Sequence, residues 1–400
     1  MQHTITEHFI RYYPERLNFS DLLDKGIINN GIIIKIRLKN KPANDRKTIF
    51  EIPGALKIET GVYHFPEALE NMDFYRKGEC YDVYADENGN SPYIEAEIML
   101  HQEYGEEKMR SMSLGLPLNL YNAAESEIYL LFDGVRFAWI VGGEIANINF
   151  PVGYIQAEDG DIYISDSIEI GICSDIKSLE SEEKTETKNE SIAFYSARGY
   201  NAWAGDIVNF YHDGVYHFLV LLDRHHHGNR FGCGAHSTYH MTTRDFIHWE
   251  NYGEIYPIQN SWESFGTGTM FFWNGKYYYS HGFHTDRVIP RDKVGSRLLE
   301  KNYEREGFFS AVTYDELKEN GLYPSGANYM VSDDGIHFVQ GKKQIHCSEN
   351  PSIYKDENGG LVMYAGYGAA GVWHAPDIDG PWKKEDTDMP VFDNSSPVRN

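Results

Sequence analysis

The second half of the sequence repeats one pattern three times, and this repeat restricts the accessible folds more than any other feature. Each copy has a glycine-containing turn, an aromatic-rich run with strand-like alternation and a closing segment with a polar turn. Units of this kind predict the blades of a β-propeller, and about three blades fit between residues 191 and 400, fewer than a closed ring contains. The turns lie at 213–214, 274–275 and 358–360, and the closing segments at 243–249, 332–338 and 375–382.

The first copy, residues 203–249, contains three strand-like runs. Residues 206–211 and 215–222 flank an Asp-Gly hairpin turn, and residues 237–242 form the third run. Asp206 lies in an otherwise apolar stretch. Glycoside chemistry requires a carboxylate of this kind, because an oxocarbenium-like transition state needs a negative charge near the anomeric carbon. The local pattern also allows a second interpretation, in which Asp206 caps a turn beside a glycine.

Four segments of the first copy carry a resemblance to a known family. They are Trp203 to Asp206, Tyr216 to Phe218, Gly234 to His236 and His240 to Trp249. In these segments the copy resembles the first blade of glycoside hydrolase family 32, the β-fructosidases, which are five-bladed propellers related to family 43. The resemblance implies hydrolysis of β-fructofuranosides or related glycosides, with Asp206 as nucleophile and Trp203 in the substrate site.

Positions next to Asp206 depart from the family 32 pattern. Gly205 replaces an asparagine, residues 207–209 replace Pro-Asn-Gly, and Leu221 stands where the second strand ends in glutamine. Because these are sugar-recognition positions, the resemblance supports the blade and the nucleophile, and it leaves a different furanoside or pyranoside open as the substrate.

The second copy contributes three candidate substrate ligands. Thr267-Gly268-Thr269 resembles the Ser-Gly-Ser stretch of the family, where small residues let the backbone approach the sugar. Trp262 offers an aromatic face to a sugar ring, with packing between blades as the alternative. Glu263 is a candidate acid or hydroxyl ligand, and a solvated charge at a strand edge is its alternative.

The third copy opens with Glu349-Asn350-Pro351. This triplet stands at the place of the family's Arg-Asp-Pro motif, so Glu349 and Asn350 are predicted to bind substrate hydroxyls. An alternative register aligns it with Glu-Cys-Pro, which would make Glu349 the general acid. The spacing from the preceding closing segment favours the first register, and the acid then falls at or beyond Asn400.

Polar residues follow the most hydrophobic run of the first copy, with Asp223 leading into the histidines 225–227. We expect them to form a polar rim around a sugar pocket, with Asp223 and His225 among the substrate ligands. A metal site that includes His236 and His240 is the alternative. Three adjacent histidines on a loop cannot all point one way, and the spacing of strong zinc motifs is absent, so no metal is assigned.

The first part of the chain, residues 1–176, has short alternating runs that predict a β-sandwich. Its Asp133-Gly134 hairpin resembles those of concanavalin-like or laminin-G-like jelly rolls. This resemblance implies a sugar-binding or a structural role for the domain. The densely charged segment 177–190 is predicted to be a linker, because it cannot bury surface. The propeller domain then spans residues 191–400. The predicted fold class is all-β.

The charge and cysteine content narrow the set of partners. A net charge of −24 argues against nucleic acid and anionic membranes. No apolar run approaches membrane-spanning length and no signal peptide is visible, so a cytoplasmic location is expected. Separated cysteines without a C-x-x-C pair are predicted to be reduced thiols; they are Cys80, Cys173, Cys233 and Cys347.

The resemblance implies a retaining mechanism, in which Asp206 attacks the anomeric carbon while a carboxylic acid protonates the leaving oxygen. Two other functions stay open. One is a glycan-binding protein or degenerate hydrolase, favoured by the neutral Asn350 and the missing Glu-Cys pair. The other is a family 43-like inverting hydrolase of arabinan or xylan. An oligosaccharide or glycoside is the expected partner and no cofactor is expected, while the oligomeric state is left open.

Overall fold

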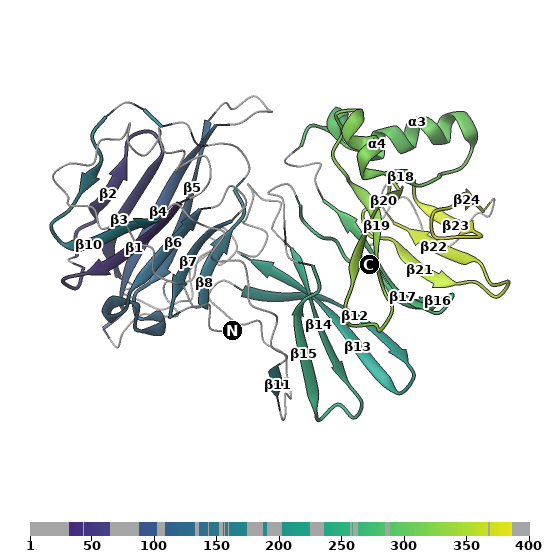
Figure 1. Cartoon of the computed structure of the whole chain (residues 1–400), viewed down its shortest axis with the longest axis horizontal. Helices are drawn as coiled ribbons and strands as arrows, with labels where there is room; N and C mark the ends of the chain where they lie inside the picture. Colours follow the sequence, from purple (N-terminus) through teal and green to yellow (C-terminus); the bar gives the residue numbers. More distant parts are fainter. Residues whose placement is uncertain are drawn as a thin grey trace. The chain divides into compact units, whose positions relative to one another are not determined.

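The structure is a computed structural model and describes residues 32–42, 44–64, 88–101, 109–132, 136–142, 144–151, 155, 157–158, 160–173, 187–189, 202–224, 236–256, 258, 263–284, 289–366 and 369–385. Strands make up nearly all of the regular structure in this part, which confirms the all-β class (Figure 1). No helix among these residues combines the length and apolar character needed to cross a membrane. Contacts divide the chain into two compact units, the first ending at Thr185 apart from two short later segments.

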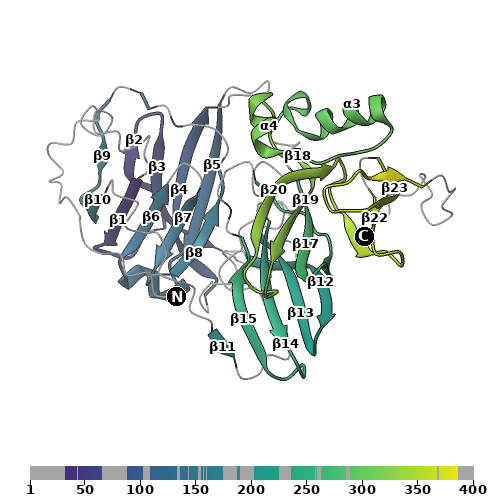
Figure 2. The same ribbon diagram turned by 45° about the vertical axis from the view of Figure 1, so that its right-hand side comes forward.

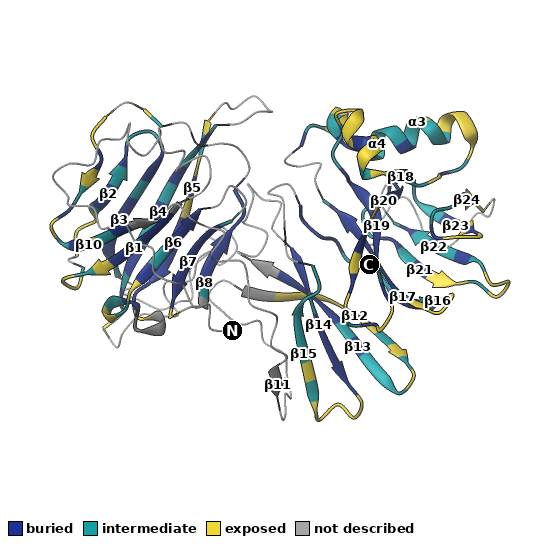
Figure 3. Cartoon of the chain, in the orientation of Figure 1, coloured by how far each residue is buried: buried dark blue, intermediate teal, exposed yellow. Residues whose placement is uncertain are grey.

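Two five-stranded antiparallel sheets form the first unit. In spatial order, one sheet contains β10 (Ile168–Cys173), β1 (Ile32–Leu38), β6 (Ile128–Phe132), β7 (Phe137–Val141) and β8 (Glu144–Asn149). The other contains β5 (Met109–Pro117), β4 (Asn90–His101), β3 (Leu56–His64), β2 (Lys47–Ile52) and β9 (Tyr163–Ile164). Figure 3 shows buried residues along the strands of both sheets.

Both sheets of the first unit contribute to one hydrophobic core. Strands such as β4 alternate buried and more exposed residues, so one face of the sheet carries the buried side chains that form this core. Ile36 of β1, Phe50 of β2 and Trp139 of β7 belong to the same buried cluster. The Trp139 Nε1 donates a hydrogen bond of 2.7 Å to the carbonyl oxygen of Leu114 on β5. Since β7 and β5 lie in different sheets, this bond links the two layers and satisfies a buried donor.

Three antiparallel sheets form the second unit (Figure 2). The first contains β11 (Thr187–Asn189), β15 (Trp249–Glu254), β14 (Ser237–Thr243), β13 (Val215–Arg224) and β12 (Ala202–His212). The second contains β16 (Met270–Trp273), β17 (Lys276–Phe283), β19 (Gly326–Ser332), β20 (Val339–His346) and β18 (Val312–Thr313). The third contains β21 (Ser352–Lys355), β22 (Leu361–Ala365), β23 (Gly371–Ala375) and β24 (Lys383–Lys384).

The three sheets of the second unit pack in sequence order. The His212 ring of the first sheet stacks on Phe272 of the second, with centroids 4.1 Å apart. The second and third sheets share a hydrophobic core, and the Trp273 Nε1 donates a hydrogen bond of 3.0 Å to the carbonyl oxygen of Gly359. Each predicted repeat therefore corresponds to one sheet that packs against the next.

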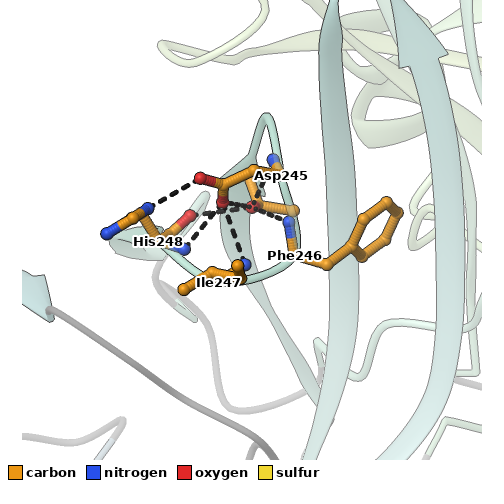
Figure 4. Close-up of polar contacts among 5 residues, drawn as sticks. Asp245, Phe246, Ile247 and His248 are labelled. Carbon is orange, nitrogen blue, oxygen red and sulfur yellow. Dashed lines mark hydrogen bonds and ion pairs between the residues drawn. The ribbon is translucent and has the colours of Figure 1, made fainter.

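The closing segments of the first two repeats fold alike. The Asp245 Oδ1 accepts hydrogen bonds of 2.9 and 2.8 Å from backbone amides two and three residues ahead, and Oδ2 lies 2.6 Å from the His248 Nδ1 (Figure 4). Asp334 repeats the arrangement at 2.8, 2.8 and 2.6 Å, with His337 as its imidazole. An aspartate that bonds its own following backbone fixes a tight turn, which explains the repeated Asp and His.

Two features differ from the expectation. The region between β17 and β19 contains two helices, α3 (Ser296–Glu306) and α4 (Tyr314–Glu319), that the strand-based reading of the repeat did not predict. The last residues of the expected linker form β11, which pairs with β15. Strand pairing uses backbone groups only, so a polar segment without apolar side chains can still join a sheet edge.

Candidate functional site

Asp206 lies inside β12, at one edge of the first sheet, and is exposed. It is not in a turn, so the turn-capping interpretation is wrong. Phe210 and His212 of the same strand contact Tyr277 and Phe272 of the second sheet. Because side chains two residues apart in a strand share one face, Asp206 belongs to the face of β12 turned toward the second sheet.

The Asp206 carboxylate lies close enough to Tyr279 to influence its titration. Tyr279 is buried on β17, and its hydroxyl is 3.4 Å from the Thr238 Oγ1. The pKa of Tyr279 is raised to about 12: burial contributes most, the hydrogen bond with Thr238 opposes the rise, and the negative charge of Asp206 adds to it. The carboxylate therefore lies within electrostatic range of the Tyr279 phenol, which stays protonated at neutral pH.

Glu263 is buried, with 3% of its surface exposed, so it is not the solvated strand-edge charge of the alternative interpretation. Its charge adds to the effect of burial in raising the pKa of both Tyr256 and Tyr314. The Tyr314 hydroxyl in turn donates to the Asn328 Oδ1 at 2.8 Å and accepts from the Gln340 Nε2 at 2.9 Å. Glu263 is thus a buried charge that acts on Tyr256 and on the hydrogen-bonded Tyr314.

Glu349 and Asn350 precede the third sheet and lie against the end of β17. The Glu349 Oε2 is 3.1 Å from the His284 Nδ1, and the Glu349 side chain is 32% exposed. The Glu349 carbonyl oxygen approaches Gly282 so closely that a Cβ there would be only 1.4 Å away. The Asn350 Oδ1 is buried and has no hydrogen-bond partner among the described residues. The segment therefore combines an accessible carboxylate with a buried amide.

The Thr267-Gly268-Thr269 stretch joins strands instead of presenting an open backbone. A Cβ on Gly268 would lie 2.0 Å from the Ser280 carbonyl oxygen, so the close approach is to β17. The Thr269 Oγ1 donates a hydrogen bond of 2.8 Å to the carbonyl oxygen of Ile353 in the third sheet. Thr267 itself is partly buried. The small residues are thus needed for close packing against β17, and not for the approach of a sugar that the sequence predicted.

Four of the remaining candidates lie outside the described part of the chain, in whole or as side chains. Trp203 and Asp223 belong to β12 and β13, and their side chains lie outside the described part, as do His225 and Trp262 entirely. His240 is buried on β14. In the part of the chain that is described, no group of three or more His, Cys, Asp or Glu side chains could hold a metal ion.

The strand β17 meets the two carboxylate regions on opposite faces of the second sheet. The charge of Asp206 acts on Tyr279, and the backbone of Glu349 packs against Gly282. These two residues are three positions apart, so they face opposite sides of the strand and lie about 10 Å apart along it. The sequence interpretation missed Tyr279 and His284, because their relation to the two carboxylates depends on pairing between distant segments.

Comparisons with known proteins give structural likeness only. No protein-family model and no curated protein sequence matches the chain. One solved glycoside hydrolase is matched at 10% identity and a TM-score of 0.32, over 53% of this chain and 64% of that one. Another is matched at 13% identity and a TM-score of 0.29, and the chain spans 37% of its length. An α-L-arabinanase from Penicillium chrysogenum with arabinobiose is matched at 10% identity and a TM-score of 0.29, over 88% of this chain and 85% of that one.

Proposed function

We propose that the second unit is a glycoside hydrolase domain of the β-propeller type, related to families 32 and 43, with Asp206 as a catalytic carboxylate. One observation supports this most strongly. Asp206 is exposed on an edge strand, on the face turned toward the second sheet, and its charge acts on the Tyr279 phenol, which lies 3.4 Å from the Thr238 Oγ1. An accessible carboxylate beside hydrogen-bonding groups suits reaction at an anomeric carbon.

In this proposal the three sheets are consecutive blades, and the first unit is a jelly-roll-like sandwich with a sugar-binding or structural role. The domain boundary lies within residues 177–190, and the protein works in the cytoplasm. β-Fructofuranosides are the first substrates to test, because the segment around Asp206 resembles family 32. Arabinofuranosides and xylosides follow, since residues 207–209 depart from that family's sugar-recognition pattern.

For the proposed reaction we adopt the alternative register of residues 349–351, in which Glu349 supplies the acid. Its side chain is one-third exposed, whereas Glu263 is buried, and the His284 imidazole orients its carboxyl group. Asp206 attacks the anomeric carbon as the glycosidic bond breaks, and the leaving oxygen takes the proton of Glu349. Water then cleaves the glycosyl ester, transferring a proton back to Glu349.

A glycan-binding protein without hydrolysis is the second candidate. Asn350 is neutral, and its Oδ1 is buried without a partner among the described residues. A neutral amide in this place cannot stabilise a developing positive charge as an aspartate would. This candidate predicts sugar binding that is independent of Asp206 ionisation.

The test uses aryl β-fructofuranosides, α-arabinofuranosides and β-xylosides with the full chain. We expect Asp206→Asn to lower kcat/KM on the accepted substrate at least about a thousandfold, because the variant keeps the shape and removes the nucleophile. Glu304→Gln, an exposed change on α3, is the control and keeps the wild-type rate. An unchanged rate in Asp206→Asn overturns the assignment. Binding of the same sugars without turnover favours the second candidate.

A further inference from the structure

Asn350 carries a buried polar atom whose role the proposed reaction leaves open. Its Oδ1 is buried and has no hydrogen-bond partner among the described residues. A buried acceptor without a partner is costly, so native structures place a donor beside such an atom. Because burial shields this oxygen from a substrate, we look for the donor among the side chains around it.

The backbone of Gly266 leaves room for this oxygen to lie next to an imidazole. A Cβ on Gly266 would be only 2.6 Å from the Asn350 Oδ1 and 2.4 Å from the His284 Nε2. Both atoms therefore border the same small space, which a side chain at position 266 would fill. The His284 Nε2 can donate a proton in a hydrogen bond, and an amide oxygen can accept one. The imidazole is thus the donor that this oxygen calls for.

The other nitrogen of the same ring faces the proposed acid. The His284 Nδ1 is 3.1 Å from the Glu349 Oε2. Backbone hydrogen bonds hold the segments around the ring, since the His284 amide donates to the Ser264 carbonyl oxygen at 2.9 Å and the Gly266 amide donates to that of Gly282 at 2.7 Å. The ring therefore lies between a buried amide oxygen and a carboxyl group whose side chain is 32% exposed.

The two nitrogens of an imidazole are coupled, because the hydrogen bond made by one decides which of them carries the proton. An amide oxygen only accepts, so it favours a proton on Nε2. In the neutral ring Nδ1 then presents a lone pair to Glu349, and the contact between them is favourable only when the carboxyl group carries a proton. With the ring proton on Nδ1 instead, the Asn350 Oδ1 would face a lone pair.

We propose that Asn350 is a positioning residue for the acid: its Oδ1 accepts the Nε2 proton of His284, and the ring held in this way keeps Glu349 protonated. The broad torsion at the end of an asparagine side chain lets the amide turn to close this bond. During the reaction the Glu349 proton passes to the leaving oxygen as the glycosidic bond breaks, and the Nε2 proton stays in place. This inference rests on the proposed function only where it names Glu349 as the acid.

Long-range proton–nitrogen NMR spectroscopy of the full chain with isotope-labelled histidine tests the ring state without any substrate. The spectra are recorded at about pH 8, where an ordinary histidine is uncharged. His284→Gln assigns the signals. We expect a protonated Nε2 and an unprotonated Nδ1 in the wild type. Asn350→Leu removes the acceptor and should move the proton to Nδ1, beside the Glu349 carboxylate. A protonated Nδ1 in the wild type, or the same ring state in both proteins, overturns the proposal.

Two further variants separate the acceptor from the bulk of the side chain. Asn350→Asp keeps an acceptor of the same shape, so Nε2 should stay protonated. Asn358→Leu is the matched control, since Asn358 is exposed in the turn after β21 and should leave the ring unchanged. Loss of the Nε2 proton in Asn350→Asp would show that the wild-type amide donates to the ring, and it would overturn the proposal.

Kinetics connect the ring to the reaction. A sugar leaving group needs a proton from the acid, whereas a nitrophenolate departs without one. Asn350→Leu should therefore lower kcat/KM at least about tenfold on an accepted oligosaccharide and less than about twofold on the nitrophenyl glycoside of the same sugar. An equal loss on both substrates refutes a role through Glu349. If the wild type hydrolyses no glycoside, the proposed function fails, while the NMR spectra still decide whether Asn350 sets the state of the ring.

Discussion

Gly282 illustrates how single residues without chemistry of their own position the site. The Glu349 carbonyl oxygen occupies the space that any Cβ at Gly282 would fill, so only glycine lets the segment before the third sheet reach β17. That contact brings Glu349 to His284 at 3.1 Å. A bulkier residue would displace the carboxylate that the proposed reaction uses as its acid.

The Gly282→Ala variant should lower the free energy of unfolding by about 3 kcal/mol or more, because a backbone segment must move to accommodate the methyl group. Gly205→Ala on β12 is the matched control, since a Cβ there meets only ordinary contacts, the nearest at 3.4 Å from Leu221. Urea denaturation of both variants measures the difference. Equal stability of the two would contradict the close approach of Glu349.

At the scale of elements, the contact between the first and second sheets depends on imidazoles as well as on apolar side chains. His217 and His240 are buried on neighbouring strands, and their rings stack with centroids 5.3 Å apart. Burial, then the positive charge of His212, lowers the pKa of His217 to about 4. Burial, then the charge of His217, lowers the pKa of His240 to about 3, while Asp334 opposes this shift. Both rings are therefore neutral in the folded protein at pH 7.

Acid should destabilise this contact. The unfolded chain takes up protons on these histidines near pH 6.5, while the folded chain does not until about pH 4, so the stability they provide is complete above pH 6.5 and is lost as the pH falls toward 4. We expect the His217→Phe variant, which cannot take up a proton, to lose roughly 2 kcal/mol less than wild type between pH 7 and pH 4.5. Urea midpoints at the two pH values measure this. The exposed His374→Phe should behave as wild type, and an identical decline in all three proteins would refute the role of His217.

At the scale of the whole molecule, the two units have separate hydrophobic cores. Among the described residues, the cluster that contains Trp139 consists of first-unit residues, and the cluster that contains Met363 joins the second and third sheets of the second unit. Because each of these clusters is built from the residues of one unit, each unit should unfold as its own cooperative element.

Thermal unfolding should therefore show two transitions. Trp139→Phe loses the hydrogen bond to the Leu114 carbonyl and leaves a small void, so it should lower the first unit's transition. Met363→Ala creates a cavity in the other core. It should lower the free energy of unfolding of the second unit by about 2–4 kcal/mol, and with it only that unit's transition temperature. Differential scanning calorimetry distinguishes these outcomes. A single transition that both variants shift equally would show that the units unfold together.

The sequence determined the all-β class and the strands around its turn signals. The Asp-Gly turn at 213–214 and the strands beside it were predictable, because turn chemistry and strand alternation act between residues close in the chain. The helices α3 and α4 were not foreseen, since short amphipathic segments gain their stability from packing. Asp206 was singled out from its motif, and the structure shows it exposed within a strand.

Only the tertiary structure decided which polar groups meet. It buried Glu263 among tyrosines, seated Glu349 beside His284 and turned the small residues at 267–269 toward β17 instead of toward a ligand. Each of these outcomes joins segments tens of residues apart. The free energy of such contacts depends on burial and on partners that local pattern does not specify, and for that reason sequence alone could nominate these residues but not assign their surroundings.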